Sequence, residues 1–430
     1  MLEARTDTVS KPPMKHVVIL SDTLPPEYTD EAGRTAWALG QGLLAAGQRV
    51  TFVTATDGPS GRESRQGVPV HRVHSRYATR WRAWFGLMNP QTLWPLNRLL
   101  RQLQPDVVHA HNVATHLSYH SLVIGRFAGA ATVYTAHNAL PIVYRHLPVS
   151  WDGARPRCGE ADYRLPFVYN LRREGLRWNP ARNLSIRHTM RYYTDVRVAV
   201  SGALKAALEA NRLSPFHVVH PGVDLRALDV PDAAVTALRQ RWRLGGRRVL
   251  LAAAEDAGGW AQALATLECV RAHVPEAALV LLTERVAAAR AQIAAAPALS
   301  PHVRVSGALS VAERAAAYRL AELALVLSAH FAPFPLANVE AMACGAPPIT
   351  SCFGGGAEAV RDGEIGFVVN PHDADALAER ALRLLRDAAL RQRMAAAGRA
   401  HAAAHFSLHA YAARTLEIYE QALARRREKA

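Results

Sequence analysis

The residues that could do chemistry gather between positions 330 and 360. This stretch reads HFAPFPLANVEAMACGAPPITSCFGGGAEAV and holds two carboxylates, Glu340 and Glu358, on either side of a glycine run that includes Gly354 and Gly355. Taken alone, Glu340 would be a carboxylate on the surface of a helix, as such residues are in most proteins. A function for these residues therefore depends on the ordered motifs around them and on the elements that position them.

Short β-branched runs alternate with helical stretches along the whole chain. In the first half, strand candidates such as HVVIL, DVVHAH and ATVYTAH end in polar residues, and the pattern restarts after VVHPGVDLRAL. Strands separated by helices predict parallel sheets covered on both faces, with a site at the carboxyl ends of the strands. Two such units in a row predict an α/β fold of two Rossmann-like, doubly wound domains that face each other across a cleft.

Boundaries can be placed where this alternation starts, stops or is interrupted. Residues 141–194 form a long, basic and aromatic interruption, and the chain end reads as an amphipathic helix whose apolar face must pack on something. The ordered pattern begins at Met14, which is an alternative start of translation. The predicted units are a disordered extension (1–13), a first domain (14–215) with the insertion at about 141–194, a second domain (216–405) and a C-terminal helix (406–430) that packs back on the first domain.

The charge of the chain is strongly positive, at +15, from 51 Lys and Arg against 36 Asp and Glu. No acidic residue lies between Glu63 and Asp106, where arginines and tryptophans are frequent. We expect a patch at positions 80–84 to bind an anionic membrane surface or an acceptor, with a solvated basic face as the alternative. Nucleic acid is not expected as a partner, because the basic segments contain no RNA- or DNA-binding motif. The patch consists of Arg80, Trp81, Arg82 and Trp84.

No apolar run approaches the roughly 18 to 20 residues that cross a bilayer, and the first residues lack the order of a signal peptide. We therefore expect a cytoplasmic protein, peripheral on the inner face of the membrane. In that compartment the cysteines are expected to be reduced, and their spacing predicts neither a disulfide nor a zinc or other metal site. They are Cys158, Cys269, Cys344 and Cys352.

Over nearly its whole length the sequence resembles the family 4 retaining glycosyltransferases, which have the GT-B fold. The resemblance rests on the strand ends DVVHAH and YTAHN, on AVSGALKAAL and HPGVD, and most specifically on residues 340–385. It implies a first domain for the acceptor and a second domain for a nucleotide sugar. The implied donor is a UDP-sugar or a GDP-sugar, the implied acceptor is lipid-linked or a polysaccharide, and no cofactor is needed.

The resemblance also gives roles to individual residues. Glu340 is expected to accept hydrogen bonds from the ribose hydroxyls of the donor, at the start of a helix that Gly345 ends. The backbone amides at Gly354 and Gly355 are expected to approach the diphosphate, before a short helix that ends near Glu358. His137, in YTAHN, would face the donor from the first domain as the catalytic candidate; its alternative is a hydrogen-bonded core or loop histidine.

The phosphate-binding part of the site departs from the family pattern. The position of a glycine pair in the first domain holds Asp30 and Glu31, whose charges would repel a diphosphate. An arginine and a lysine of the second domain are replaced by Ala253 and Gly258. Losing two charge-assisted hydrogen bonds costs about 3 to 6 kcal/mol of transition-state stabilisation. Arg34 is a candidate to replace the missing cations.

The hexose-binding part departs as well, because Ala332 stands where the family has a carboxylate, seven residues before Glu340. Two functions therefore stay open. The first is a retaining hexosyltransferase, in which the leaving diphosphate helps to deprotonate the acceptor hydroxyl. The second is a catalytically silent relative that binds a glycan or a partner protein.

Overall fold

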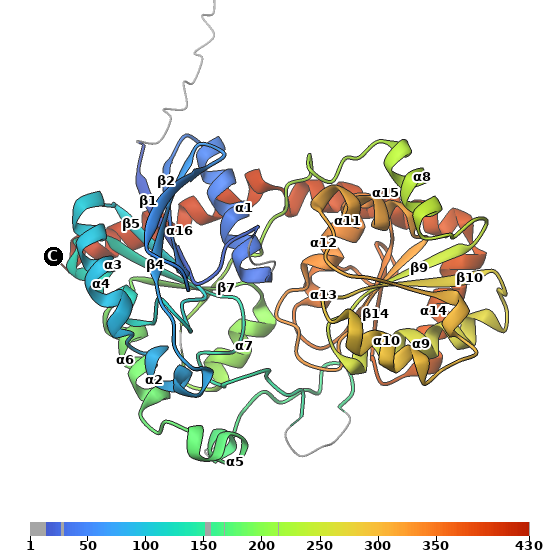
Figure 1. The fold of residues 1–430 in the computed structure, drawn as a ribbon, viewed down its shortest axis with the longest axis horizontal. Coiled ribbons are helices and arrows are strands. Elements are labelled where there is room, and N and C mark those ends of the chain that lie inside the picture. The colour runs from blue at the N-terminus through green and yellow to red at the C-terminus, as the bar shows by residue number, and fades with distance from the viewer. Residues whose placement is uncertain (1–13, 27–29, 151–155, 167, 214, 430) are drawn as a thin grey trace, which may run out of the picture.

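The computed structural model describes residues 14–26, 30–150, 156–166, 168–213 and 215–429; the predicted extension 1–13 lies outside them. Two α/β domains lie side by side, each built around its own sheet (Figure 1). The predicted two-domain architecture with parallel sheets is confirmed.

The first domain is built on an eight-stranded sheet in the order β3-β4-β2-β1-β5-β6-β7-β8. All neighbours are parallel except the hairpin β3–β4, which the sequence did not predict. The strand β1 is buried along its whole length, as expected for a strand covered on both faces. The strands are β1 (His16–Ser21), β2 (Arg49–Thr56), β3 (Gly61–Arg65), β4 (Val68–His74), β5 (Val107–His111), β6 (Ala131–Ala136), β7 (Val196–Ala199) and β8 (His217–Val218).

Helices of the first domain cover this sheet, and their caps explain where several of them begin. The side chain of Asp30 caps α1 by accepting a hydrogen bond from the amide of Gly33 at 3.4 Å, and the apolar stripe of α1 packs on the sheet. Part of the interruption at 141–194 folds as α5, η2 and α6. The helices are α1 (Glu31–Ala45), η1 (Thr79–Trp81), α2 (Arg82–Phe85), α3 (Pro90–Leu103), α4 (His120–Phe127), α5 (Tyr169–Glu174), η2 (Gly175–Arg177), α6 (Arg182–Tyr192) and α7 (Gly202–Ala210).

The second domain has a six-stranded, wholly parallel sheet in the order β11-β10-β9-β12-β13-β14. The order reverses next to β9, so the carboxyl ends of β9 and β12 border a crevice of the kind that binds nucleotides. Its elements are α8 (Asp232–Arg241), β9 (Arg248–Ala253), α9 (Ala257–Arg271), β10 (Ala277–Leu282), α10 (Val286–Ala294), η3 (Ser300–His302), β11 (Val303–Ser306), α11 (Val311–Leu320), β12 (Leu323–Val326), α12 (Leu336–Cys344), β13 (Pro348–Ser351), α13 (Gly356–Ala359), β14 (Phe367–Val369), α14 (Ala374–Arg386) and α15 (Ala388–His405).

The chain passes between the domains twice, at two neighbouring places. The first passage follows β8, which belongs to the first sheet although it lies just beyond the boundary predicted at residue 215. The second passage leads into α16 (Leu408–Glu428), whose Tyr411, Ile418 and Tyr419 join the core of the first domain (Figure 1). A Cβ on Gly222 would lie 2.6 Å from the carbonyl oxygen of Ser407, so the two passages touch only because residue 222 is glycine.

Candidate active site

Glu340 lies between the two domains and is 3 % exposed. It is placed by α12, which ends at Gly345 with φ of +84°, as the sequence predicted. Its Oε1 pairs with Nη2 of Arg34 on α1 of the first domain, and its Oε2 lies 2.9 Å from Nε of Arg314 on α11. The carboxylate expected to bind ribose is therefore already neutralised by one arginine from each domain.

Glu31 contributes a second contact between α1 and α12. Its Oε1 accepts a hydrogen bond from the amide of Leu336 at 2.7 Å, in the first turn of α12, where backbone amides lack partners within the helix. Desolvation by the surrounding protein raises the pKa of Glu31 to about 7, even though part of its side chain stays open to solvent. The two carboxylates in place of the family's glycine pair thus serve as helix caps, Asp30 for α1 and Glu31 for α12.

Glu358 makes the reverse contact, from the second domain to the first. Its carboxylate accepts hydrogen bonds from the amides of Gly202 at 2.7 Å and Ala203 at 2.8 Å, at the start of α7. Nε2 of His220 lies 2.9 Å from the same carboxylate. Burial opposes ionisation, but these hydrogen bonds hold the pKa of Glu358 below its usual value. The structure therefore places Glu358 as a cap of α7 in the opposite domain.

The glycine loop after β13 lies against the segment that follows β12. Gly354 has φ of +98°, and a Cβ there would lie 2.0 Å from the carbonyl oxygen of Ala332. The amide of Gly355 donates to that oxygen at 2.9 Å, and a Cβ on Gly355 would lie 2.8 Å from Cβ of Ser201 in the first domain. Both positions require glycine for close backbone approach, but the Gly355 amide expected at the diphosphate is engaged by Ala332.

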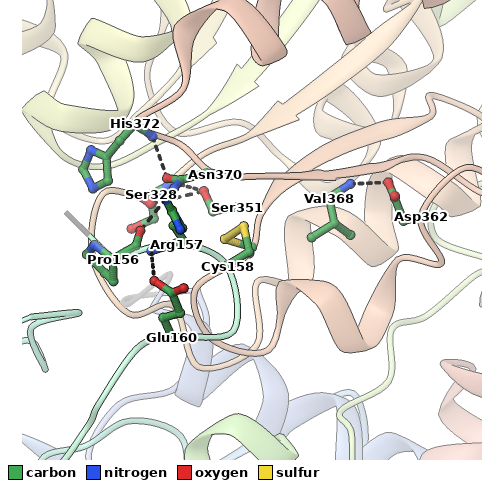
Figure 2. Close-up of a disulfide and its surroundings, with 11 residues drawn as sticks. Pro156, Arg157, Cys158, Glu160, Ser328, Ser351, Asp362, Val368, Asn370 and His372 are labelled. Atoms are coloured by element: carbon green, nitrogen blue, oxygen red, sulfur yellow. Dashed lines mark hydrogen bonds between the residues drawn. A yellow bond between two sulfur atoms is a disulfide. The ribbon is translucent and has the colours of Figure 1, made fainter.

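A disulfide joins Cys158 of the insertion to Cys352, directly before the glycine loop, with the Cα atoms 5.6 Å apart (Figure 2). Beside it the side-chain amide of Asn370 donates to the carbonyl of Pro156 at 3.1 Å (Figure 2). The prediction that all cysteines are reduced was wrong for this pair, because the two residues are 194 positions apart and only the folded insertion brings them together. Cys269 and Cys344 are free thiols, and the described residues hold no group of ligands suited to a metal ion.

The positions of the missing phosphate ligands lie at the start of α9. A Cβ on Gly258 would lie 2.9 Å from Cβ of Ala329, so a lysine here would need its neighbours to move. In place of a cation, Asp256 caps α9 by accepting from the amide of Gly259 at 2.8 Å. This part of the site therefore lacks both the charges and the space of the family pattern.

Two histidines that the sequence did not single out face each other across the domains. The rings of His146, from the insertion, and His330, from the segment after β12, are stacked with centroids 6.1 Å apart and planes within 10°. Burial, the neighbouring His330 and, more weakly, Arg173 lower the pKa of His146, while Asp256 opposes them. No spacing in the sequence could have joined these two residues, since they lie in different domains.

His137 follows β6 and belongs to a buried row of histidines at the carboxyl ends of β5 and β6. Its Nε2 lies 2.8 Å from Nδ1 of His111, whose Nε2 lies 3.3 Å from Nδ1 of His109. His109 also contacts the hydroxyl of Tyr419 on α16 at 2.8 Å. Burial lowers the pKa of His137 and of His109 to about 3, so both rings are neutral near pH 7.

The structure exposes most of the patch at positions 80–84. Trp81 and Trp84 are 48 % and 51 % exposed, and the guanidinium of Arg80 lies 5.8 Å from the Trp81 ring. Arg82 instead turns inward and donates to the carbonyl of Tyr144 at 3.0 Å, so it supports the insertion. None of the helices in the described part of the chain has the length and apolarity to cross a membrane.

Two models of glycosyltransferase families match this chain. Residues 32–227 match the model Glycosyltransferase Family 4, and residues 272–401 match the model Glycosyl transferases group 1. Together with the two facing Rossmann-like sheets, these matches define the class of fold, which is GT-B.

Individual relatives agree with this class. The chain is 37 % identical over 227 residues to D-inositol 3-phosphate glycosyltransferase of Xylanimonas cellulosilytica, covering 50 % of this chain and 53 % of the relative. It is 35 % identical over 122 residues to phosphatidyl-myo-inositol mannosyltransferase of Mycobacterium leprae, covering 28 % of this chain and 32 % of the relative. The matched regions thus span about half or less of these relatives.

Solved structures resemble the chain over nearly its full length. Sucrose-phosphate synthase from Thermosynechococcus elongatus has a TM-score of 0.72 at 20 % identity, covering 95 % of this chain and 99 % of that one. Anabaena HepE in complex with UDP and glucose has a TM-score of 0.67 at 16 % identity, covering 94 % and 99 %. At these identities the likeness supports the fold.

Proposed function

We propose that this protein is a retaining hexosyltransferase that takes a sugar from UDP or GDP and transfers it to a lipid-linked or polysaccharide acceptor. The observation that carries the proposal is the buried carboxylate of Glu340, held between the domains at the position where the family binds ribose. A buried carboxylate can accept hydrogen bonds from both hydroxyls of a ribose diol. The solved relative with bound UDP and glucose makes a nucleotide sugar a reasonable donor.

Arg34 gives the site a cation that the family pattern would not predict. In the structure it is paired with Glu340, and Glu31 lies beside it. When a ribose diol takes over hydrogen bonds to Glu340, Arg34 becomes free to bind the diphosphate, which offsets the loss of the cations at Ala253 and Gly258. Donor binding would then replace the ion pair between Arg34 and Glu340 by an ion pair between Arg34 and the diphosphate.

The reaction itself needs few protein groups under this proposal. The bond from the anomeric carbon to the diphosphate oxygen breaks, the acceptor oxygen attacks from the same face, and the acceptor proton passes to the leaving diphosphate. His137, neutral near pH 7, would hydrogen-bond a hexose hydroxyl and so orient the sugar. The tryptophans at 81 and 84 would hold a lipid-linked acceptor or an anionic membrane surface.

The alternative is a catalytically silent relative that binds a glycan or a partner, and a specific observation favours it. The positions of the family's arginine and lysine hold Ala253 and Gly258, a side chain at 258 would contact Ala329, and the Gly355 amide is already bonded to Ala332. A protein that binds no nucleotide would keep Glu340 only for its two ion pairs, which stabilise the contact between the domains.

Calorimetric titration with UDP and GDP separates these two functions. The proposal expects binding that Glu340→Gln and Arg34→Gln each weaken at least tenfold, whereas Arg290→Gln, on α10 beside Val303 at the start of β11, leaves it unchanged. Hydrolysis or transfer from the matching nucleotide sugar, with the product's anomeric configuration read by NMR, then tests retention. Absence of binding by either nucleotide at millimolar concentration contradicts the transferase and supports the silent relative.

A further inference from the structure

A groove of about 600 Å³ opens on the first domain between β4 and α3, away from the candidate active site. Four strands of the sheet separate β4 from β7, the strand whose end meets the second domain. We propose that this groove binds an acidic oligosaccharide. The groove is lined by Ser60, Gly61, His71, Arg72, Val73, Trp94, Pro95, Arg98, Leu99 and Gln102.

One wall of the groove is the outward face of α3. The helix packs inward through Thr92, Leu96 and Leu100, and this leaves the side chains at 94, 98 and 102 in a stripe of four-residue spacing on the other face. Trp94 in this stripe is 79 % exposed, the most exposed of the large apolar side chains in the described residues. A tryptophan left this open on a groove wall is typical of a binding surface, because its burial would otherwise be favourable.

The opposite wall is the hairpin β3–β4. His71 on β4 points to the face of the sheet that α3 covers, whereas the side chain of Arg72 lies on the other face, where its Nη2 is 2.9 Å from Oε2 of Glu63 on β3. Glu63 is the last acidic residue before Asp106, so both α3 and the stretch leading to it carry positive charge without acidic neighbours in sequence. The groove therefore presents a net positive, partly ordered surface.

These groups match the chemistry of a saccharide that carries carboxylates or phosphates. A sugar ring has an apolar C–H face that can stack on an indole, and hydroxyls at its edge that pair with planar polar side chains such as those of His71 and Gln102. Guanidinium groups bind carboxylates and phosphates in bidentate fashion, which suits Arg98 to the acidic groups of the saccharide.

A role of the groove in the reaction, in which it holds a distant part of the acceptor saccharide, rests on the proposed transfer to a saccharide-bearing acceptor. Binding in the groove itself needs no donor. The transferase function and saccharide binding in the groove can therefore fail separately. Groove binding without nucleotide binding favours the silent, glycan-binding relative. Nucleotide binding without groove binding overturns only the proposed saccharide site.

The test is a fluorescence and calorimetric titration of the full chain, without nucleotide, using tetragalacturonate as the probe. We expect saturable binding that Trp94→Ala and Arg98→Gln each weaken at least tenfold. Arg101→Gln is the matched control, since it removes the same charge from an exposed position of α3 outside the groove. Thermal unfolding and far-UV circular dichroism check that the variants are folded.

Three further probes decide what kind of ligand the groove takes. Maltotetraose is expected to bind at least tenfold more weakly than tetragalacturonate, and inorganic tripolyphosphate is expected to bind without dependence on Trp94. The inference is overturned if tetragalacturonate does not bind, or if Trp94→Ala leaves its affinity unchanged. It is also overturned if Trp94→Ala abolishes flotation with phosphatidylglycerol vesicles while saccharide affinity is unaffected, because the tryptophan would then be a membrane anchor.

Discussion

The ribose end and the diphosphate end of the candidate donor site differ in how much of the family's binding residues they retain. At the ribose end the family's carboxylate remains, and arginines from both domains bind it. At the diphosphate end the cations are absent, and a disulfide and a backbone contact occupy the loop that would bind phosphate. The difference teaches that Glu340 joins the domains through its two ion pairs whether or not it binds the proposed donor, whereas a phosphate ligand would serve only the donor.

The largest expected effect comes from removing the shared carboxylate. Glu340→Ala should lower the free energy of unfolding by about 3 to 5 kcal/mol, because it leaves two arginines in a largely enclosed site without their partner. Urea denaturation measures this. Glu364→Ala, which removes a pair with Arg361 on the surface, should cost less than about 1 kcal/mol. Equal losses in the two variants would contradict a structural role for Glu340.

Breaking the disulfide should have the next largest effect. Cys158→Ser should lower the free energy of unfolding of the oxidised protein by about 2 to 4 kcal/mol, because the bond restricts the unfolded chain over a long loop. Thermal unfolding with and without dithiothreitol reads the effect, and reductant should lower the melting temperature of the wild type but not of the variant. Cys269→Ser, at an exposed free thiol, is the control. A wild type insensitive to reductant would contradict the bond.

The smallest of the three effects concerns pH, and it tests the buried histidine row of the first domain, to which His137 belongs. The native pKa of His137 lies near 3, below the ordinary 6.5, so acid protonates the unfolded chain first and stability falls as pH drops from about 6.5. At pH 5 this amounts to about 2 kcal/mol per histidine.

His137→Asn should reduce the loss of stability between pH 7 and pH 5 by that amount, measured by urea denaturation at both pH values. Glu31, with a raised pKa, works in the opposite direction, but equally in both proteins. The control substitution is His273→Asn, which removes an exposed ring outside the buried row. An unchanged slope in His137→Asn would show that this ring titrates freely.

Local patterns in the sequence predicted the strands other than β3 and β8 and the helix end at Gly345, because each depends on neighbouring residues. The contacts of Glu31 with α12 and of Glu358 with α7 could not be predicted, since each carboxylate caps a helix in the opposite domain. The disulfide of Cys158 was missed because its two cysteines meet only in the folded protein. The expectation of a cytoplasmic protein, in which cysteines are normally reduced, also argued against it.

Surface features were the hardest to predict. Arg82 was expected to be exposed with Arg80, yet the folded insertion offers it a backbone carbonyl. The groove at Trp94 depends on the hairpin β3–β4, whose first strand is exposed and lacks the apolar alternation that would have revealed it. In both cases the missing information was which distant segment lies alongside.

The passages at Gly222 and Ser407 lie together and would by themselves form a hinge about which the two halves could swing. The sulfur bridge at Cys158 adds a third covalent tie, at the glycine loop that faces the first domain. With this third covalent connection, the two domains can no longer rotate freely about the hinge. In the oxidised molecule we therefore expect the two halves to separate less at this edge than they do after the bond between Cys158 and Cys352 is reduced.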